Sequence, residues 1–241
     1  GVRLDKSELS AMAVGGLLAD IASRPLPRKL IHKNNVKHQK IAGILLAAGS
    51  SRRMGAENKL LLPIYDRLPM IRWIAQTFLD ADIDKLIVVT GFQHETISKA
   101  LLGLDIEFVH NHDHLTGQAS SVACGIKSLS EQYDGALIGL ADMPFITSDL
   151  ISRLIKSHEL LSKPEVRITM PIIEGRRANP VIWGRAFFDD LQDISGDEGG
   201  RQILSAYLSA VNGVSWDKIE VAEDIDLPED IKKLSEISKE M

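Results

Sequence analysis

The sequence predicts an α/β fold of three layers, in which a mostly parallel sheet carries helices on both faces. From residue 40 onward, short apolar segments alternate with longer amphipathic segments. The apolar segments are nearly continuous, which is typical of strands buried on both faces of a parallel sheet. Strands that alternate with amphipathic helices along the chain indicate the same architecture.

Each element follows from the local pattern of apolar residues. The expected strands are residues 40–48, 84–91, 106–110, 135–142, 166–173 and 179–184, and the expected helices are residues 69–81, 93–102, 117–130 and 147–161. In sheets of this kind, ligands bind beyond the carboxyl ends of the strands. Three such ends carry polar segments: LAAGSSRRMG follows the first strand, HNHDHLTGQASS the third and ADMP the fourth. We therefore expect one ligand site at that edge of the sheet.

The first 39 residues differ from the rest of the chain. Residues 7–23 have a serine cap and helical apolar spacing, which a glycine pair at 15–16 weakens. Residues 24–40 contain two prolines, six Lys or Arg and two histidines, a composition typical of a linker. Such a basic linker could also contact an anionic ligand or a neighbouring subunit. We therefore divide the chain into an N-terminal helix and basic linker at 1–39 and a main domain at 40–241.

Composition and charge limit the classes of partner. The 241 residues carry a net charge of −5 and no excess of basic residues, so nucleic acid is not expected as a partner. No apolar run approaches the ~20 residues that cross a bilayer, and a signal-peptide pattern is missing. We therefore expect no membrane partner and a cytoplasmic chain. Cys124 is the only cysteine, which excludes an intrachain disulfide, and its helical setting favours a small buried side chain.

The loop after the first strand has the composition of a phosphate site. Gly49 and Gly55 permit unusual backbone conformations, so the amides between them can point at phosphate oxygens. Arg52, Arg53 and Lys59 could balance the charge of a triphosphate. Because neighbouring side chains of an extended segment point to opposite sides, only one of the two arginines is expected to point inward. A glycine-bearing turn with solvated arginines would have the same composition, because the segment matches neither GxGxxG nor GxxxxGK[ST].

Carboxylates near two apolar runs suggest a metal site. Asp142 ends a strand just before a proline, where a hard cation such as Mg²⁺ can be held by carboxylate and phosphate oxygens together. Asp142 could instead cap the next helix, but Thr147 and Ser148 are better placed for that role. Asp224 and Asp226 lie two residues apart and would share one side of an extended segment. They also fit the acidic first turn of a helix that begins at PED.

Six segments of the sequence, taken in order, resemble one known family. The segments are LAAGSSRRMGAENKLL, GQASSVACGI, LADMPFIT, GRRANPVIW, SGDEGGRQIL and DIDLPEDI, and the resemblance covers about residues 40–238. They closely resemble the molybdenum cofactor cytidylyltransferases, members of a nucleotidyltransferase superfamily that also contains the guanylyltransferases for this cofactor. The resemblance implies a Rossmann-like nucleotidyltransferase fold of the GT-A type. It also implies that residues 1–39 could be the tail of a fused molybdopterin-binding domain.

The resemblance implies a reaction that suits these residues. A terminal phosphate of the molybdopterin cofactor attacks the α-phosphorus of CTP, or of GTP, and pyrophosphate leaves in a Mg²⁺-dependent transfer. Because the nucleophile is already an anion, the protein positions the reactants and neutralises charge, and no catalytic base is needed. Arg53, Lys59 and Asp142 are the implied catalytic residues. Asp142 would hold the metal together with Asp226 or, less favoured, Asp224.

The resemblance also assigns binding residues. Those implied for the nucleotide are Leu46, Ala47, Ala48, Gly49, Ser50, Ser51, Arg53, Lys59, Gly117, Ser120 and Ser121. Those implied for the acceptor are Arg177, Asn179, Gly199, Gly200 and Arg201, where backbone amides ahead of a helix suit a phosphate. The sequence departs from the family at Gln118, where methionine is frequent, and at Leu227, where threonine is usual. LAAG, rather than the LAGG of the guanylyltransferases, favours CTP over GTP.

Other interpretations stay open. A glycosyltransferase that uses a sugar nucleotide would share the sheet and the metal aspartate, and a binding module could keep the pocket without turnover. A molybdoenzyme or its chaperone is a further expected partner of the transferase. His110, His112 and His114 alternate, so an extended segment would place three imidazoles on one side, as in a zinc site, but no further ligand pattern completes the set. His94 and His158 are expected on solvated helix surfaces.

Overall fold

The computed structural model describes residues 38–49 and 58–225. Several predictions therefore lie outside the described residues. These are the N-terminal helix and most of the linker, together with Ser50, Ser51, Arg52, Arg53, Gly55, Asp226 and Leu227.

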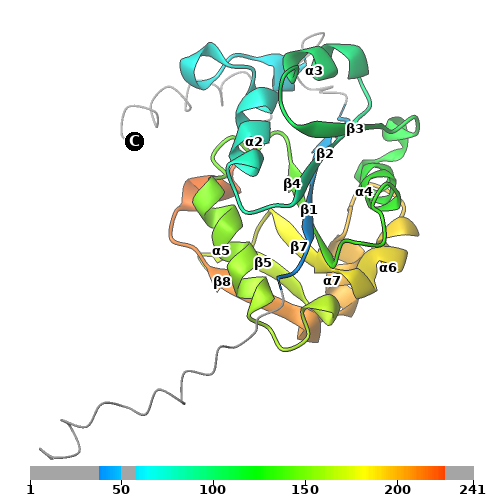
Figure 1. Ribbon diagram of the computed structural model, residues 1–241, viewed down its shortest axis with the longest axis vertical. Coiled ribbons are helices and arrows are strands. Elements are labelled where there is room, and N and C mark those ends of the chain that lie inside the picture. The colour runs from blue at the N-terminus through cyan, green and yellow to red at the C-terminus, as the bar shows by residue number, and fades with distance from the viewer. Residues whose placement is uncertain (1–37, 50–57, 226–241) are drawn as a thin grey trace, which may run out of the picture. The chain divides into compact units, whose positions relative to one another are not determined.

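The described part of the chain is built on one mixed sheet of eight strands (Figure 1). The strand order is β3-β2-β1-β4-β7-β5-β6, and β8 pairs with β5. The first four strands along the chain run parallel to one another, whereas β7 is antiparallel to both β4 and β5. The strands are β1 (Ile41–Ala47), β2 (Lys85–Thr90), β3 (Ile106–His110), β4 (Gly135–Leu140), β5 (Ile168–Ile173), β6 (Arg176–Arg177), β7 (Val181–Gly184) and β8 (Val211–Ser215).

Helices cover both faces of this sheet, so the predicted three-layer α/β fold is confirmed. The α-helices are α2 (Met70–Leu79), α3 (His94–Ala100), α4 (Gln118–Lys127), α5 (Ser148–Glu159), α6 (Phe188–Gln192) and α7 (Arg201–Ala206). The first four of them lie within the predicted ranges. The sequence did not predict α6, β6 or β8, whereas the resemblance implied a helix at the Gly199-Gly200-Arg201 turn, where α7 begins. The helix α6 and the strand β6 are too short for a clear apolar period, and VNGVS buries only Val214.

The two faces of β1 show how the layers form. Ile41 and Leu45 belong to a core shared with α2, α3 and α5, whereas Ile44 and Leu46 belong to a second core shared with α4, α6 and α7. Successive side chains of a strand point to opposite faces, so a continuously apolar strand serves both cores. On the second face, a Cβ at Gly125 would lie 2.7 Å from Ile44 Cγ2. This glycine therefore lets α4 approach β1 closely.

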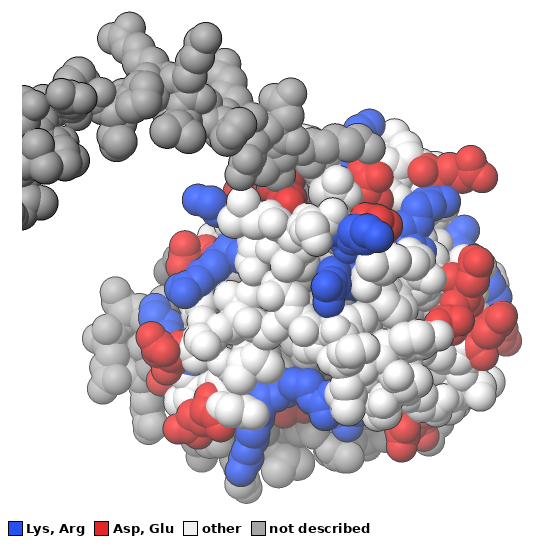
Figure 2. Space-filling view, turned by 90° about the horizontal axis from the view of Figure 1, so that it is seen from below, with Lys and Arg blue, Asp and Glu red and all other residues white. Residues whose placement is uncertain are grey.

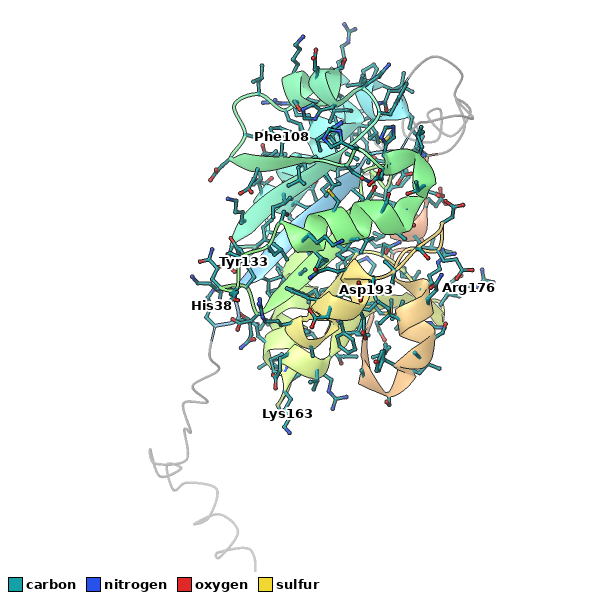
Figure 3. All side chains as sticks on the ribbon, turned by 90° about the vertical axis from the view of Figure 1, so that its right-hand side faces the viewer. His38, Phe108, Tyr133, Lys163, Arg176 and Asp193 are labelled. Atoms are coloured by element: carbon teal, nitrogen blue, oxygen red, sulfur yellow. The ribbon has the colours of Figure 1, made fainter. Side chains whose placement is uncertain are left out.

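The carboxyl ends of β1 to β4 lie on the same side of the sheet. His38 and Tyr133 precede β1 and β4 and lie at one side of the sheet, whereas Arg176 lies at the opposite side (Figure 3). Because β7 runs against β4, its first residues reach the edge at which β1 to β4 end. The segments that follow the parallel strands and the segment that precedes β7 therefore meet at one place.

His158 corrects an expectation about the surface. Its side chain is 1% exposed rather than solvated, because α5 packs against β5 at this point. Its Nδ1 lies 2.9 Å from Thr169 Oγ1, and burial lowers the pKa of the imidazole to about 4. The sequence pattern around His158 and Glu159 predicted a helix, but it did not indicate that His158 is the residue of this turn that faces the sheet.

On the face shown in Figure 2, Lys and Arg are interspersed with Asp and Glu, and these described residues form no continuous basic patch there. Across residues 38–49 and 58–225, the helices are too short or too polar to span a membrane.

Candidate functional site

Lys59 and Asp142 meet beyond the carboxyl ends of β1 and β4. Lys59 opens a short 3₁₀ helix, whose N-cap Asn58 accepts a hydrogen bond from the Leu60 backbone N–H at 3.1 Å. Leu60 is buried, which anchors this turn against the core. Lys59 Nζ lies 2.8 Å from Asp142 Oδ2, and the two side chains are only 13% and 24% exposed. The structure thus places an ammonium and a carboxylate in contact, largely shielded from solvent.

Both side chains line a cavity of about 400 Å³. Seven residues predicted for the nucleotide or metal line it, namely Leu46, Ala48, Gly49, Lys59, Gly117, Ser121 and Asp142. The remaining lining residues are Leu60, His114, Leu115, Gln118, Leu140 and Asp197. Ala47 is buried in β1, and Ser120 lies next to the cavity with its hydroxyl hydrogen-bonded to backbone carbonyls. Neither of these two lines the cavity.

Asp197 is a lining residue that the sequence did not single out. Its loop packs on the start of α4, where the Ala119 N–H donates to the Gly196 carbonyl at 3.0 Å. Gly117 has φ +117°, and a Cβ there would lie 2.5 Å from both Asp197 Oδ1 and the Gly196 carbonyl oxygen. The motif SGDEGGRQIL contains Asp197, but its approach to Gly117 is a long-range contact that local sequence does not indicate.

A second cavity of about 90 Å³ adjoins the first. The two share Leu46, Gln118 and Leu140. Four residues predicted for the acceptor, Asn179, Gly199, Gly200 and Arg201, line the second cavity. Trp183 also lines it and was not predicted. Arg177 is exposed on β6 and does not line either cavity.

The C-terminal acidic segment approaches Asp142 through its backbone. The Ile225 N–H donates to the Asp142 carbonyl oxygen at 2.9 Å. The neighbouring Asp224 is exposed and does not line the larger cavity, and Asp226 lies outside the described residues. Within residues 38–49 and 58–225, no three His, Cys, Asp or Glu side chains form a ready-made metal site.

Two of the alternating histidines, His110 and His112, pack edge to face with each other, and His94 packs against His110 at a tilt. The ring centroid of His110 lies 4.6 Å from that of His94 and 4.4 Å from that of His112. Burial, followed by the charges of neighbouring histidines, lowers the pKa of His110. His114 leaves the alternation because it begins a 3₁₀ helix, and it lines the larger cavity. The structure therefore gives no support to a zinc site among the described histidines.

Cys124 is half-buried on α4, and its Sγ–H points at the His110 carbonyl at 3.9 Å. Burial raises the pKa of its thiol. A raised pKa keeps the sulfur protonated and unreactive near neutral pH. The expectation of an inert cysteine fits this environment, although the side chain is less buried than predicted.

Residues 43–211 match the family of the MobA-like NTP transferase domain. The chain belongs to this family. This MobA-like domain is also similar to the bifunctional protein GlmU of Thermosipho africanus, with 30% identity over 195 residues that cover 81% of this chain and 35% of that protein. It thus spans about a third of the length of that relative. Nicotine blue oxidoreductase of Paenarthrobacter nicotinovorans is 26% identical over 80% of this chain and 96% of its own length.

Solved structures share the fold of this MobA-like domain. Rv0371c from Mycobacterium tuberculosis superposes with a TM-score of 0.72 at 24% identity, over 83% of this chain and 99% of that chain. The family match over residues 43–211 confirms the nucleotidyltransferase superfamily predicted from the six motifs, and the shared fold confirms the Rossmann-like architecture. The chain carries a nucleotidyltransferase domain.

Proposed function

We propose that this domain transfers a nucleoside monophosphate from a nucleoside triphosphate to a phosphate group of an acceptor, with release of pyrophosphate. The observation that carries the proposal is the contact of Lys59 with Asp142 inside the larger cavity. An ammonium group can balance the charge of a triphosphate, and a carboxylate at the end of a strand can hold a divalent cation. The predicted Arg53 would add a second positive charge.

The donor set fits Mg²⁺ that binds together with its substrate. Mg²⁺ commonly uses one or two carboxylates plus phosphate oxygens and keeps several waters. Asp142 supplies one carboxylate in the cavity, and the hydrogen bond from Ile225 holds the start of the acidic segment against its backbone. We therefore propose Asp142 as the principal ligand, with Asp226, or Asp224, as the second. When bound, the ion would neutralise charge on the phosphates.

The reaction needs charge control more than proton transfer. An oxygen of the acceptor phosphate forms a bond to the α-phosphorus, and the bond from that phosphorus to the pyrophosphate oxygen breaks. Because the attacking oxygen carries no proton at neutral pH, the residues around it act by position and charge. Lys59 would hold the leaving pyrophosphate, while the backbone of Ala48 and Gly49 lines the same cavity.

CTP is the proposed nucleotide. Ala48 lines the cavity and is 3% exposed, so its methyl group takes space that a glycine would leave open. A smaller space favours a pyrimidine over a purine. GTP is the second candidate.

The acceptor proposal rests on the resemblance and on the second cavity. We propose the terminal phosphate of molybdopterin cofactor, next to Arg201, whose guanidinium suits a phosphate. Asn179, Gly199 and Gly200 line the same space, and three residues shared with the larger cavity connect it to the nucleotide. A molybdopterin-binding domain, fused or separate, and a molybdoenzyme or its chaperone would deliver the acceptor and receive the product.

Relatives of this domain show that other reactions must be tested. One relative is named an oxidoreductase, and a glycosyltransferase would release a nucleoside diphosphate.

The test is a thermal-shift screen of the four ribonucleoside triphosphates with Mg²⁺, followed by an assay for pyrophosphate with molybdopterin. A ligand of the folded state raises the melting temperature according to its affinity. CTP should give the largest shift and release pyrophosphate; indifference to all four triphosphates would overturn the proposal.

A further inference from the structure

Asn111 lies directly after β3, close to the larger cavity but not in its lining. Its side chain is buried, with a residue exposure of 4%. Its backbone N–H donates to the Thr90 carbonyl at 2.7 Å, which fixes it beside the end of β2. A buried amide at this edge of the sheet requires hydrogen-bond partners.

The hydrogen bonds determine the orientation of the Asn111 amide. Its Oδ1 accepts from the Asp113 backbone N–H at 3.0 Å, and a backbone N–H can only donate. The nitrogen therefore lies on the other side, where it donates to Ser120 Oγ at 2.9 Å and to Ser121 Oγ at 3.0 Å. Both amide hydrogens are used, and both serine oxygens act as acceptors.

The two serines differ in the direction of their own hydrogens. The Ser120 hydroxyl donates to the Gly117 carbonyl at 2.8 Å or the Asp113 carbonyl at 3.0 Å, so its hydrogen returns to the backbone. Ser121 is 5% exposed and lines the larger cavity. Among the described residues, Ser121 has no acceptor for its hydrogen, because its contact with Asn111 uses a lone pair. Its O–H is left to donate into the cavity.

We propose that Asn111 is a positioning residue that makes Ser121 a hydrogen-bond donor to a neutral acceptor atom of the nucleotide, on its base or ribose. This inference rests on the proposed function and deepens it. Lys59 is the only Lys or Arg among the described residues that line the cavity, and it already pairs with Asp142. A neutral donor on α4 therefore suits the nucleoside part of the substrate better than its phosphates.

Substitutions at Asn111 can reverse the polarity of this interaction. In Asn111→Asp, the side chain offers only acceptors, so the Ser121 hydrogen turns towards it and a lone pair faces the nucleotide. Ser121→Ala removes the hydroxyl altogether. If Asn111 acts through Ser121, the Asn111→Asp change adds no further loss of nucleotide affinity to the Ser121→Ala variant.

The experiment compares KM and kcat for CTP in the full chain, with thermal shifts for CTP and for inorganic tripolyphosphate. Ser121→Ala and Asn111→Asp should each raise the KM for CTP roughly tenfold with a smaller change in kcat, because a lost hydrogen bond in a buried site costs about that factor. The shift with tripolyphosphate should stay at the wild-type value. The double variant should match Ser121→Ala.

Ser128→Ala is the matched control, since this serine lies at the other end of α4 and donates to the Gly125 carbonyl at 2.7 Å. It should keep the wild-type KM. A wild-type KM in Ser121→Ala would overturn the inference whether or not Asn111→Asp folds. Additive losses in the double variant, or equal losses with tripolyphosphate, would also overturn it. If the wild-type chain binds no triphosphate, the proposed function itself fails. If the wild type binds CTP but Ser121→Ala keeps the wild-type KM, only the present inference fails, so the two failures are distinguishable.

Discussion

Lys59 Nζ lies 2.8 Å from Asp142 Oδ2, although the two residues belong to segments that follow different strands of the sheet. The contact follows from topology, because β1 and β4 are parallel neighbours and end at the same edge. An anionic ligand would compete with Asp142 for the Lys59 ammonium, and the cation of that ligand would compete with Lys59 for the Asp142 carboxylate.

Replacement of Lys59 by glutamine should lower kcat/KM for pyrophosphate release by about 100-fold or more. The change keeps much of the side-chain length but removes the charge proposed to face the triphosphate, and charge-assisted contacts to phosphate are strong in a shielded site. Lys85→Gln is the control, because Lys85 pairs with Glu107 at the exposed edge of the sheet. Equal activity of the two variants would contradict the proposed role of Lys59.

The Gly200→Ala change should weaken acceptor binding without an equal effect on CTP. A Cβ at Gly200 would lie 2.5 Å from Trp183 Cζ2, so the indole or the loop must shift, and both line the second cavity. Steady-state kinetics should show a several-fold higher KM for the acceptor and a nearly unchanged KM for CTP. A Trp183→Phe change in the same chain should restore part of the loss. An effect on CTP alone would argue that this cavity does not hold the acceptor.

Replacement of Ala48 by glycine should shift the nucleotide preference towards GTP. Ala48 is one of the residues that line the larger cavity, and in our proposal a glycine at this position leaves more room for a purine. The ratio of kcat/KM for CTP to that for GTP should fall severalfold, in line with the small worth of one methyl group in a pocket. An unchanged ratio would show that Ala48 does not contact the base.

His158 should make folding stability depend on pH. Asn212 Nδ2 donates to Thr169 Oγ1 at 3.2 Å, so the Thr169 hydroxyl can donate to His158 Nδ1 and favour the neutral ring. Its pKa of about 4 in the folded state is below the 6.5 of an unperturbed histidine. Protonation therefore favours the unfolded chain, and this contribution to stability is complete above pH 6.5 and lost as the pH falls towards 4. The loss is on the order of 3 kcal/mol.

Chemical denaturation of the wild type and of His158→Gln at several pH values measures this contribution. The difference in unfolding free energy between the two proteins should change across pH 4 to 6.5 and stay constant above it. Identical pH profiles would show that the buried imidazole is not responsible.

Much of the fold could be predicted because its main elements depend on local patterns. β1 is apolar throughout, and α2 and α5 place their apolar residues at helical spacing, so both types of element were predicted within a few residues. β8 was missed because its pairing with β5 is a long-range interaction and only Val214 of its residues is buried. The inward position of His158 was missed for a similar reason, since its partner Thr169 lies on another element.

The candidate site was predictable where motifs follow strands. Lys59, Asp142 and Ser121 were chosen from such segments, and the structure places all three in the lining of one cavity. Asp197 and Asn111 were not chosen. Their importance depends on where a distant loop meets Gly117 and on the orientation of one buried amide, and no local pattern encodes either feature.

The central claim is tested most directly by Asp142→Asn, which keeps the shape of the side chain and removes its charge. With CTP, Mg²⁺ and molybdopterin, the wild type should release pyrophosphate, and the variant should be slower by about 10³-fold while it unfolds at a similar temperature. Wild-type rates of pyrophosphate release in Asp142→Asn would contradict the account.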